Sequence, residues 1–283
     1  MSKLLIVNAD DFGLTKGINQ GVIKAFREGI VRSASIMAVG RAYDHAVRLT
    51  KENPRLDIGI HLCLIEEKPI LAKEEISSLV GKDGYFLHNP REFIFSYLLG
   101  RIKLVQIEKE FDAQIRKVLD SRLKITHIDS HSYIHILPSV LRIVIGLAKK
   151  YGILFIRYPY ERLINFHAGR LSRQFIRCIL NMLCLASRQN FKDKGILTAD
   201  YFYGFLNSGR LSGAYLEQIL KDTREGVTEI ICHPGVYSQD TQRYSHWQYL
   251  WPEELDILIS GNIKKIIEEK KMELTSFREC HEA

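Results

Sequence analysis

Short, uniformly apolar runs alternate along the chain with longer segments in which apolar residues recur every three or four positions. Residues 4–7 form the first apolar run, and a polar cluster at 8–13 follows it directly. Such a run is typical of a strand that is buried on both faces, as in a parallel sheet. Residues 16–28 then carry apolar side chains at helical spacing, and Gly29 stands where glycine commonly ends a helix. The start of the chain therefore predicts one strand followed by one helix.

The same alternation continues through most of the chain. Strands that alternate with helices indicate βαβ units and a parallel sheet. We therefore expect an α/β fold in which residues 1–283 form a single-domain, distorted (β/α) barrel similar to a TIM barrel. An irregular excursion is expected at 68–90, which carries a Gly-Lys-Asp-Gly turn. Further strands are predicted at residues 34–39, 56–62, 125–131, 155–159 and 229–235, helices at 42–51, 107–119, 139–150 and 253–270, and a final apolar piece at 272–277.

One segment departs from this alternation. Residues 167–194 predict a basic amphipathic helix in which Arg170, Arg173, Arg177 and Arg188 surround an apolar stripe. Such a helix packs its stripe on the barrel or on a second subunit, which would make the protein a homodimer. The alternative is a helix that lies on an anionic membrane surface or binds a nucleic acid.

Composition places the chain among ordinary globular proteins. Its 283 residues are 46% apolar and 26% charged, values that exclude a disordered chain. The 40 Lys and Arg exceed the 33 Asp and Glu by seven, which is weak support for a polyanionic partner over this length. Five cysteines without a CxxC pair fit a reducing compartment, and no apolar run approaches the roughly 20 residues of a membrane span. We expect a soluble, cytoplasmic protein with no signal peptide, no transmembrane segment and no nucleic-acid partner.

Ionisable side chains stand at the ends of four predicted strands. The carboxyl ends of parallel strands share one rim, so residues that are far apart in sequence meet there. Carboxylates with two or three histidines, without thiolates, suit Zn²⁺, Mn²⁺, Fe²⁺, Co²⁺ or, less readily, Mg²⁺. The pattern therefore predicts a metal site on the rim. The residues at the four strand ends are Asp10 and Asp11; His61; His127, Asp129 and His131; and His233.

The segment 127–131 is the most informative of these. If the chain stays extended, His127, Asp129 and His131 lie on one face of a strand, because side chains alternate with period two. Three ionisable groups on one face of an apolar strand are expensive to bury unless they bind a metal, a substrate or one another. The alternative is that one or two of the histidines cap the next helix or line a polar rim.

Three further positions carry alternatives of their own. Asp10 and Asp11 either cap the following helix or divide two roles between them, one as a metal ligand and the other as a general base. His233 either protonates a leaving amine or packs beneath its loop. Arg157 either orients a catalytic carboxylate or binds substrate.

Four short motifs occur in order along the chain. They are Asn-Ala-Asp-Asp-Phe-Gly at 8–13, Gly-Ile-His-Leu at 59–62, Thr-His-Ile-Asp-Ser-His at 126–131 and Cys-His-Pro-Gly at 232–235. Together they resemble the motifs of the YdjC-like family of carbohydrate deacetylases, which includes chitooligosaccharide deacetylase. The resemblance runs from residue 3 to about residue 278, and residues 29–31, 157–159 and 254–255 also take part.

The resemblance implies a distorted (β/α) barrel and a metal-dependent hydrolase that removes acetyl groups from N-acetylated mono- or oligosaccharides. It implies one divalent metal ion, Mg²⁺ first, with Zn²⁺, Mn²⁺ or Co²⁺ as alternatives. Carried over by motif, the metal ligands would be Asp11, His61 and His127. Asp10 would be the catalytic base and His233 the catalytic acid, while Asp129, His131 and Arg157 would orient the ligands or contact the substrate.

Two alternatives to this function stay open at the level of the sequence. One is another metal-dependent hydrolase on the same rim, a deformylase or a phosphoesterase. Phosphate chemistry usually needs two metals about 3.5–4 Å apart and extra carboxylates, and the motifs supply only Asp10, Asp11 and Asp129. The other is a basic membrane- or nucleic-acid-binding protein that acts through residues 167–194. If the substrate is a lipid-linked sugar, the protein would be both an enzyme and a membrane-binding protein.

Overall fold

The computed structural model describes residues 2–162 and 171–282. Within these residues the strands are β1 (Lys3–Phe12), β2 (Ser33–Ile36), β3 (Asp57–Leu62), β4 (His127–Ser130), β5 (Phe155–Ile156), β6 (Tyr201–Tyr203), β7 (Gly226–Cys232) and β8 (Met272–Thr275). The helices are α1 (Lys16–Glu28), α2 (Tyr43–Glu52), α3 (Pro90–Leu98), α4 (Leu104–Asp120), α5 (Pro138–Tyr151), α6 (Leu171–Asp193), α7 (Gly213–Asp222), α8 (Trp251–Ile259), α9 (Gly261–Glu269) and α10 (Phe277–Glu282). Two 3₁₀ helices, η1 (His131–Ile136) and η2 (Thr241–Trp247), follow β4 and β7.

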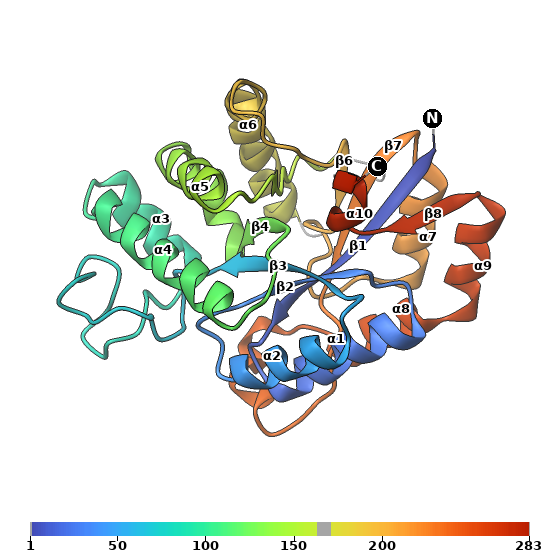
Figure 1. The fold of residues 1–283 in the computed structure, drawn as a ribbon, viewed down its shortest axis with the longest axis horizontal. Coiled ribbons are helices and arrows are strands. Elements are labelled where there is room, and N and C mark those ends of the chain that lie inside the picture. The colour runs from blue at the N-terminus through green and yellow to red at the C-terminus, as the bar shows by residue number, and fades with distance from the viewer. Residues whose placement is uncertain (1, 163–170, 283) are drawn as a thin grey trace.

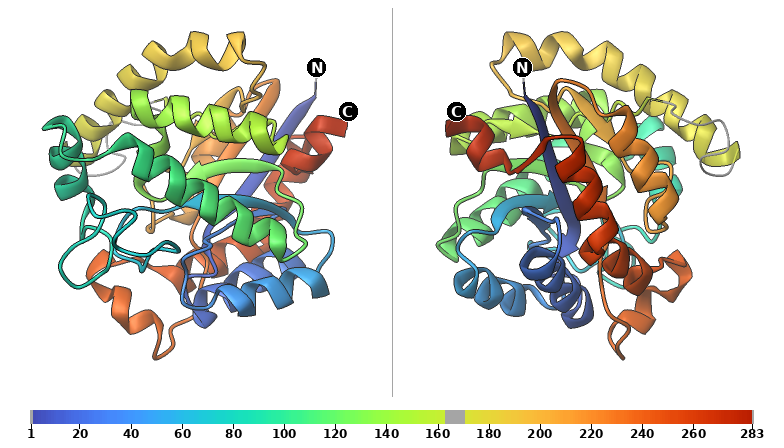
Figure 2. Two further views of the ribbon diagram at one scale, coloured as in Figure 1. Left: turned by 60° about the vertical axis from the view of Figure 1, so that its left-hand side comes forward. Right: turned by 90° about the vertical axis from the view of Figure 1, so that its right-hand side faces the viewer.

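The strands form one parallel sheet that curls into a distorted (β/α) barrel. Their order is β5-β4-β3-β2-β1-β7-β6, and β8 pairs with β1 outside this path. β7 pairs along one side of β1, while β8 pairs with the start of the other side and β2 with its end. Parallel bridges from Phe155 to Leu197 and from Glu161 to Phe202 join the two ends of the path. Helices surround the strands on the outside (Figures 1 and 2), which confirms the predicted α/β barrel.

The apolar runs form strands because the barrel buries both of their faces. In β1 every residue from Leu5 to Phe12 is buried, and the neighbouring strands β2, β3 and β4 are buried along their whole length. Each Å² of apolar surface removed from water contributes about 25 cal/mol. A strand buried on both faces therefore carries a nearly continuous apolar sequence, and its polar residues stand out.

The C-terminal part of the chain differs from the predicted pattern. The helix expected at 253–270 is two helices, because Ser260 has an extended backbone and its side chain accepts a hydrogen bond from the backbone N–H of Ile263 at the start of α9. β6, α7 and α10 have no counterpart in the prediction. β6 is only three residues long, too short to show a period.

The structure also bears on the expected basic helix and on the role of the acidic pair in β1. The basic segment forms α6 from Leu171 onward, whereas His167 and Arg170 of the expected helix lie outside the described residues. The N-cap of α1 is Thr15, whose side chain accepts a hydrogen bond from the backbone N–H of Ile18. The acidic pair Asp10 and Asp11 therefore does not cap this helix and is available for another role.

Across the described residues, no helix is both long enough and apolar enough to cross a membrane. The cytoplasmic location and the absence of a nucleic-acid partner stay predictions.

Candidate active site

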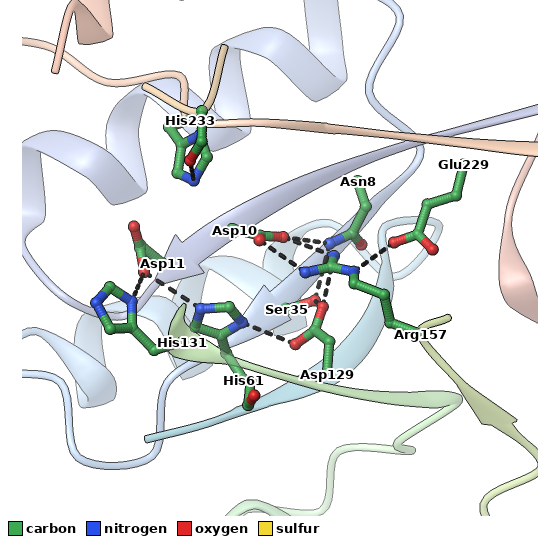
Figure 3. Close-up of polar contacts among 12 residues, drawn as sticks. Asn8, Asp10, Asp11, Ser35, His61, Asp129, His131, Arg157, Glu229 and His233 are labelled. Atoms are coloured by element: carbon green, nitrogen blue, oxygen red, sulfur yellow. Dashed lines mark hydrogen bonds and ion pairs between the residues drawn. The ribbon is translucent and has the colours of Figure 1, made fainter. Parts of the chain in front are cut away.

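Polar side chains converge at the carboxyl end of the barrel (Figure 3). Strands supply some of them directly, and the segments that follow strands supply the others. Almost all of these side chains are buried, and the most exposed is the His131 side chain at 13%. The residues are Asp10 and Asp11 of β1, His61 of β3, Asp129 of β4, Glu229 of β7, and His131, Arg157 and His233 just beyond β4, β5 and β7.

The end of β1 is built so that two consecutive acidic side chains reach the same site. In a regular strand neighbouring side chains point to opposite faces. Here the pairing of β1 with β2 shifts between Ala9 and Phe12, and Asp11 has a φ of 62°. Left-handed backbone is unfavourable for a non-glycine residue by on the order of 1–3 kcal/mol and persists where the surroundings enforce it, often at functional sites. The irregularity directs both Asp10 and Asp11 toward the site.

Asp11, His61 and His131 form a compact group of potential metal ligands. Oδ1 of Asp11 lies 3.4 Å from Nε2 of His61 and 3.1 Å from Nδ1 of His131. One donor atom from each of the three residues falls within 4.8 Å of the others. The second oxygen of Asp11, Oδ2, is buried and has no hydrogen-bond partner. A buried carboxylate oxygen without a partner is unfavourable unless a cation or an ordered water satisfies it.

The electrostatics of this group also fit a cation. Burial disfavours a charged imidazole at His61, but Asp129 and Asp11 more than offset this and raise the pKa of His61 to about 10. Burial likewise opposes the charge on Asp11, yet hydrogen bonds from His131 and His61 hold its pKa well below the usual range. The Nδ1–H of His61 donates to Oδ1 of Asp129 at 2.7 Å, which directs Nε2 toward Asp11. A carboxylate that orients an imidazole in this way is typical of metal-binding histidines.

The structure does not place His127, the third ligand expected from the sequence, in this group. Its ring stacks on Phe277 with centroids 3.9 Å apart, and it lies over Gly59, where a Cβ atom would overlap it. The Ser35 hydroxyl donates to Asp129 at 2.6 Å, so it accepts the 3.1 Å hydrogen bond from Nε2 of His127. Burial lowers the pKa of His127 to about 4, which leaves the ring neutral.

The reason for this difference is the position of each histidine along the strand axis. Successive residues on one face of a strand are separated by about 6.6 Å, so the positions of His127 and His131 would differ by about 13 Å in an extended chain. β4 ends at Ser130, and η1 begins at His131 with left-handed backbone at Ser132 and Tyr133. His131 therefore reaches Asp11 at the rim, while His127 stays in the barrel interior below it. The proposed ligand set accordingly contains His131 in place of His127.

Arg157 joins three carboxylates beside this group. Its guanidinium donates two hydrogen bonds of 2.8 Å to the two oxygens of Asp10, and it also contacts Asp129 and Glu229 at 2.6 Å each. The side chain is fully buried. Burial opposes the charge on Asp129, but Arg157 holds the pKa of Asp129 well below its usual value. Arg157 is thus placed to orient carboxylates, and it is not among the residues that line the cavity beside them.

Glu229 was not among the residues expected at the site. Burial raises its pKa to about 7 despite the contact with Arg157. Its sequence signal is a glutamate within the strand Gly226–Cys232, where residues 228–232 are all buried. Ser35 and Asn8 were also missed, although both bond to the acids, since Asn8 Nδ2 donates to Asp10 Oδ1 at 2.9 Å. The Ser35–Asp129 contact bridges different strands and leaves no mark on local sequence, whereas Asn8 and Asp10 lie two residues apart on β1.

His233 approaches the site from the opposite wall. The backbone N–H of Gly209 donates to its Nδ1 at 3.3 Å, so the proton of the neutral ring resides on Nε2. Burial lowers the pKa of His233, and the carboxylate of Glu254 accepts a 2.6 Å hydrogen bond from its backbone N–H. Its ring and those of His61 and His131 line one cavity of about 950 Å³, together with Asp10.

His135 belongs to the frame of the site. Its Nδ1 lies 2.6 Å from the Ser130 hydroxyl and its Nε2 lies 3.0 Å from the carbonyl oxygen of Arg157. Because both ring nitrogens are engaged inside the protein, His135 fixes the segments after β4 and β5.

Comparison with known proteins gives a consistent result over the whole chain. The model of the YdjC-like protein family matches residues 4–269. A carbohydrate deacetylase of Brevibacillus brevis is 32% identical over 277 residues, which cover 97% of this chain and 98% of the relative. A chitooligosaccharide deacetylase of Yersinia enterocolitica is 31% identical, with 99% and 100% covered.

A solved structure agrees with these relatives. A protein of Enterococcus faecalis, described as a candidate cellobiose-phosphate cleavage protein, matches with a TM-score of 0.78 and 29% identity over 99% of both chains. Fold, motifs and full-length similarity therefore lead to one conclusion: the chain belongs to the YdjC-like protein family.

Proposed function

We propose that this protein is a hydrolase that removes the acetyl group from an N-acetylated sugar with the help of one divalent metal ion. The observation that carries the proposal is the placement of a separate carboxylate, Asp10, beside the Asp11–His61–His131 group. The names of the Brevibacillus and Yersinia relatives support an N-acetyl sugar as the substrate.

The metal would be held by Asp11, His61 and His131. The unpartnered oxygen of Asp11 and the orientation of His61 by Asp129 fit this assignment. Two imidazoles and one carboxylate suit Zn²⁺, Mn²⁺ or Co²⁺, and Mg²⁺ is the ion that the family resemblance implies. A divalent ion there supplies a Lewis acid that polarises a carbonyl group and makes a nearby water easier to deprotonate.

Asp10 is the proposed general base. Its Oδ1 accepts hydrogen bonds from Asn8 and Arg157, while its Oδ2 accepts from Arg157. Among the described contacts, Oδ2 thus keeps a lone pair for the proton of an attacking water. The fixed guanidinium aims this carboxylate, and a positioned base typically contributes a factor of about 10²–10⁴ to the rate.

His233 is the proposed general acid. As the oxygen of water bonds to the acetyl carbon, the C–N bond breaks and the amine needs a proton. His233 lines the cavity, and in its protonated, imidazolium form the ring can donate that proton from Nε2. Asp10 takes one proton from water and the His233 imidazolium gives one to nitrogen, so the products are acetate and an amino sugar, and transfer of the proton from Asp10 to His233 through solvent restores both groups.

The contacts of Arg157 argue against a phosphoesterase. Asp10, His61 and Asp129 form a second group close enough for a metal, but Arg157 contacts both of its carboxylates. A bound guanidinium cation competes with a second metal, and the usual phosphate chemistry relies on two metals about 3.5–4 Å apart. One metal and an amide substrate agree better with this geometry.

A single assay tests the proposal. Metal-depleted protein is resupplied with Mg²⁺, Zn²⁺, Mn²⁺ or Co²⁺ and incubated with N,N′-diacetylchitobiose, an N-formyl sugar and cellobiose phosphate. Release of acetate with at least one metal, and its loss on chelation, is the expected result. Release of formate alone would identify a deformylase, and release of phosphate alone a phosphoesterase, and either outcome would overturn the proposal.

A further inference from the structure

The cavity above the site has a polar base and apolar walls. Asp10, His61, His131 and His233 lie at the base. The walls come from two helices, with Ile94, Phe95 and Leu98 on α3 and Ile176 and Ile179 on α6. One continuous cavity of about 950 Å³ therefore joins the proposed reacting groups to an apolar groove between α3 and α6, which we call the α3–α6 groove.

The groove residues are unusually exposed for apolar side chains. Phe95 is 59% exposed and Leu98 is 73% exposed. Elsewhere on α6, Leu171, Phe175 and Met182 are further apolar side chains that are each more than half exposed. Large contiguous apolar patches on a protein surface usually mark a binding site.

Specific contacts tie the α6 wall to the proposed acid. Nη1 of Arg173 on α6 donates to the carbonyl oxygen of Phe205 at 2.8 Å, and its guanidinium lies over the Phe205 ring. Three residues further on, the Ser208 hydroxyl lies 3.5 Å from Nε2 of His233. The groove is thus built onto the same loop that borders the reacting groups, and it is part of the site.

The chemistry of the walls does not match a free oligosaccharide. Each sugar ring presents several hydroxyl groups, and a hydroxyl buried without a hydrogen bond is unfavourable. Among the α3 and α6 residues that line the cavity, Ile94, Phe95, Leu98, Ile176 and Ile179 offer no side-chain donor or acceptor, and Arg91 and Arg173 are the two that do. A hydrocarbon chain gains by leaving water and needs no such partners, so it fits these walls.

Charge argues against a second copy of this chain as the occupant of the α3–α6 groove. α6 carries four basic residues and one acidic residue, and Arg91 and Arg173 line the groove. In a two-fold interface the same patch meets itself, so α6 would be placed close to another basic α6. A ligand without positive charge avoids this repulsion.

We propose that the substrate is an N-acetyl sugar that carries a hydrocarbon chain, as in a lipid-linked sugar. The acetamide group lies at the polar base near Asp10 and His233, and the chain lies in the α3–α6 groove. This inference rests on the proposed deacetylase function and adds the class of aglycone that the site selects.

The test compares methyl and octyl glycosides of N-acetylglucosamine, both kept below micelle-forming concentrations. Each methylene that the groove buries raises affinity about threefold to fourfold. The octyl glycoside is therefore expected to exceed the methyl glycoside at least about tenfold in kcat/KM for acetate release. Calorimetric titration of metal-depleted protein with the octyl glycoside is expected to show the same preference without turnover.

Matched variants locate the effect. Leu98→Gln and Ile176→Gln are expected to reduce the octyl-to-methyl ratio, because both side chains line the groove. Leu99→Gln and Leu185→Gln are the controls, because Leu99 directly follows α3, Leu185 lies on α6, and both side chains are about half exposed but do not line the groove. The controls are expected to leave the ratio unchanged.

The outcomes separate this inference from the proposed function. Acetate release from the methyl glycoside without a gain for the octyl glycoside would overturn the inference and leave the deacetylase function standing. The inference also fails if the groove variants only dissociate a dimer, measured by sedimentation, while the ratio stays constant. Release of acetate from neither glycoside, with any of the four metals, would count against the proposed function itself.

Discussion

His127 and His131 stand four residues apart on one segment, yet they occupy two different environments. His131 lies at the rim, 3.1 Å from Asp11, with 13% of its side chain exposed. His127 is fully buried in the barrel interior, packed on Phe277 and bonded to Ser35. The comparison teaches that the period-two pattern of a strand predicts on which face a side chain lies. It does not predict how far along the barrel axis that side chain lies. In this barrel, the side chains placed to share one metal are those at the carboxyl ends of the strands.

The largest effect is expected from His131→Ala. Removing a ligand leaves Asp11 and His61 alone with the ion, so metal affinity should fall by at least about 100-fold, since even the loss of an outer partner typically weakens it 10–100-fold. Acetate release should disappear with the metal. Titration of Zn²⁺ or Mn²⁺ into metal-depleted protein measures the affinity. Wild-type affinity in this variant would remove His131 from the ligand set.

Asp10→Asn should separate chemistry from metal binding. Asparagine keeps the shape of the side chain but cannot take the proton of water, so kcat is expected to fall by about 10²–10⁴. Metal content should stay at the wild-type level because Asp10 is not in the Asp11–His61–His131 group. Single-turnover acetate release and metal analysis on one preparation check both parts. An unchanged kcat would show that another group acts as the base.

His127→Ala is expected to lower the stability of the protein and to leave its metal affinity unchanged. Loss of a fully buried ring leaves a cavity, and ring-to-alanine changes in cores typically destabilise by about 3–5 kcal/mol. Urea unfolding of the metal-free protein measures this effect, and metal titration provides the second readout. If the alanine variant does not fold, His127→Gln retains most of the volume and takes its place. A loss of metal affinity without loss of stability would restore His127 as a ligand.

The smallest effect on stability is expected from Glu161, a buried carboxylate that belongs neither to the surroundings of His127 nor to those of His131. Glu161 accepts hydrogen bonds from the backbone N–H groups of Gly204 and Leu206, and burial raises its pKa to about 7. Its folded-state pKa thus exceeds the unfolded value, so the stabilisation is fully present below about pH 4.5 and is lost as pH rises through about 7. We expect about 1–3 kcal/mol less stability at pH 8 than at pH 5 from this group.

Glu161→Gln checks this expectation, because glutamine does not titrate. Unfolding free energies at several pH values should decline less steeply in the variant than in the wild-type protein. Equal slopes in both proteins would contradict the assignment. The same series run on His127→Ala gives the opposite change: the pKa of His127 is lowered to about 4 in the folded protein, so this histidine makes stability rise with pH up to about 6.5, and its removal should make the decline with pH steeper than in the wild type.

Much of the site was predictable from the sequence, for a physical reason. Asp10, Asp11, His61 and His233 each follow an apolar run, and parallel strands bring their carboxyl ends to one rim. No tertiary information is needed for that step. The relative depth of His127 and His131 depends on where β4 ends and η1 begins, and an apolar pattern does not resolve such a boundary.

Contacts between strands were the other part that sequence patterns did not reach. Arg157 joins Asp10, Asp129 and Glu229 from three different strands, and their sequence positions span more than 200 residues. The α3–α6 groove likewise depends on two helices that are far apart in sequence. β6 and the break at Ser260 were missed because a three-residue strand and a single capping serine are weak local signals.

The most direct test of the account is to locate the metal itself. Crystals of the protein grown with Zn²⁺ or Mn²⁺, with diffraction data collected at the absorption edge of the metal, give its position from anomalous scattering. The account predicts one peak, bound by Asp11, His61 and His131, with His127 still bonded to Ser35. A peak coordinated by His127, or a metal bound elsewhere with the Asp11 group free of it, would contradict the account.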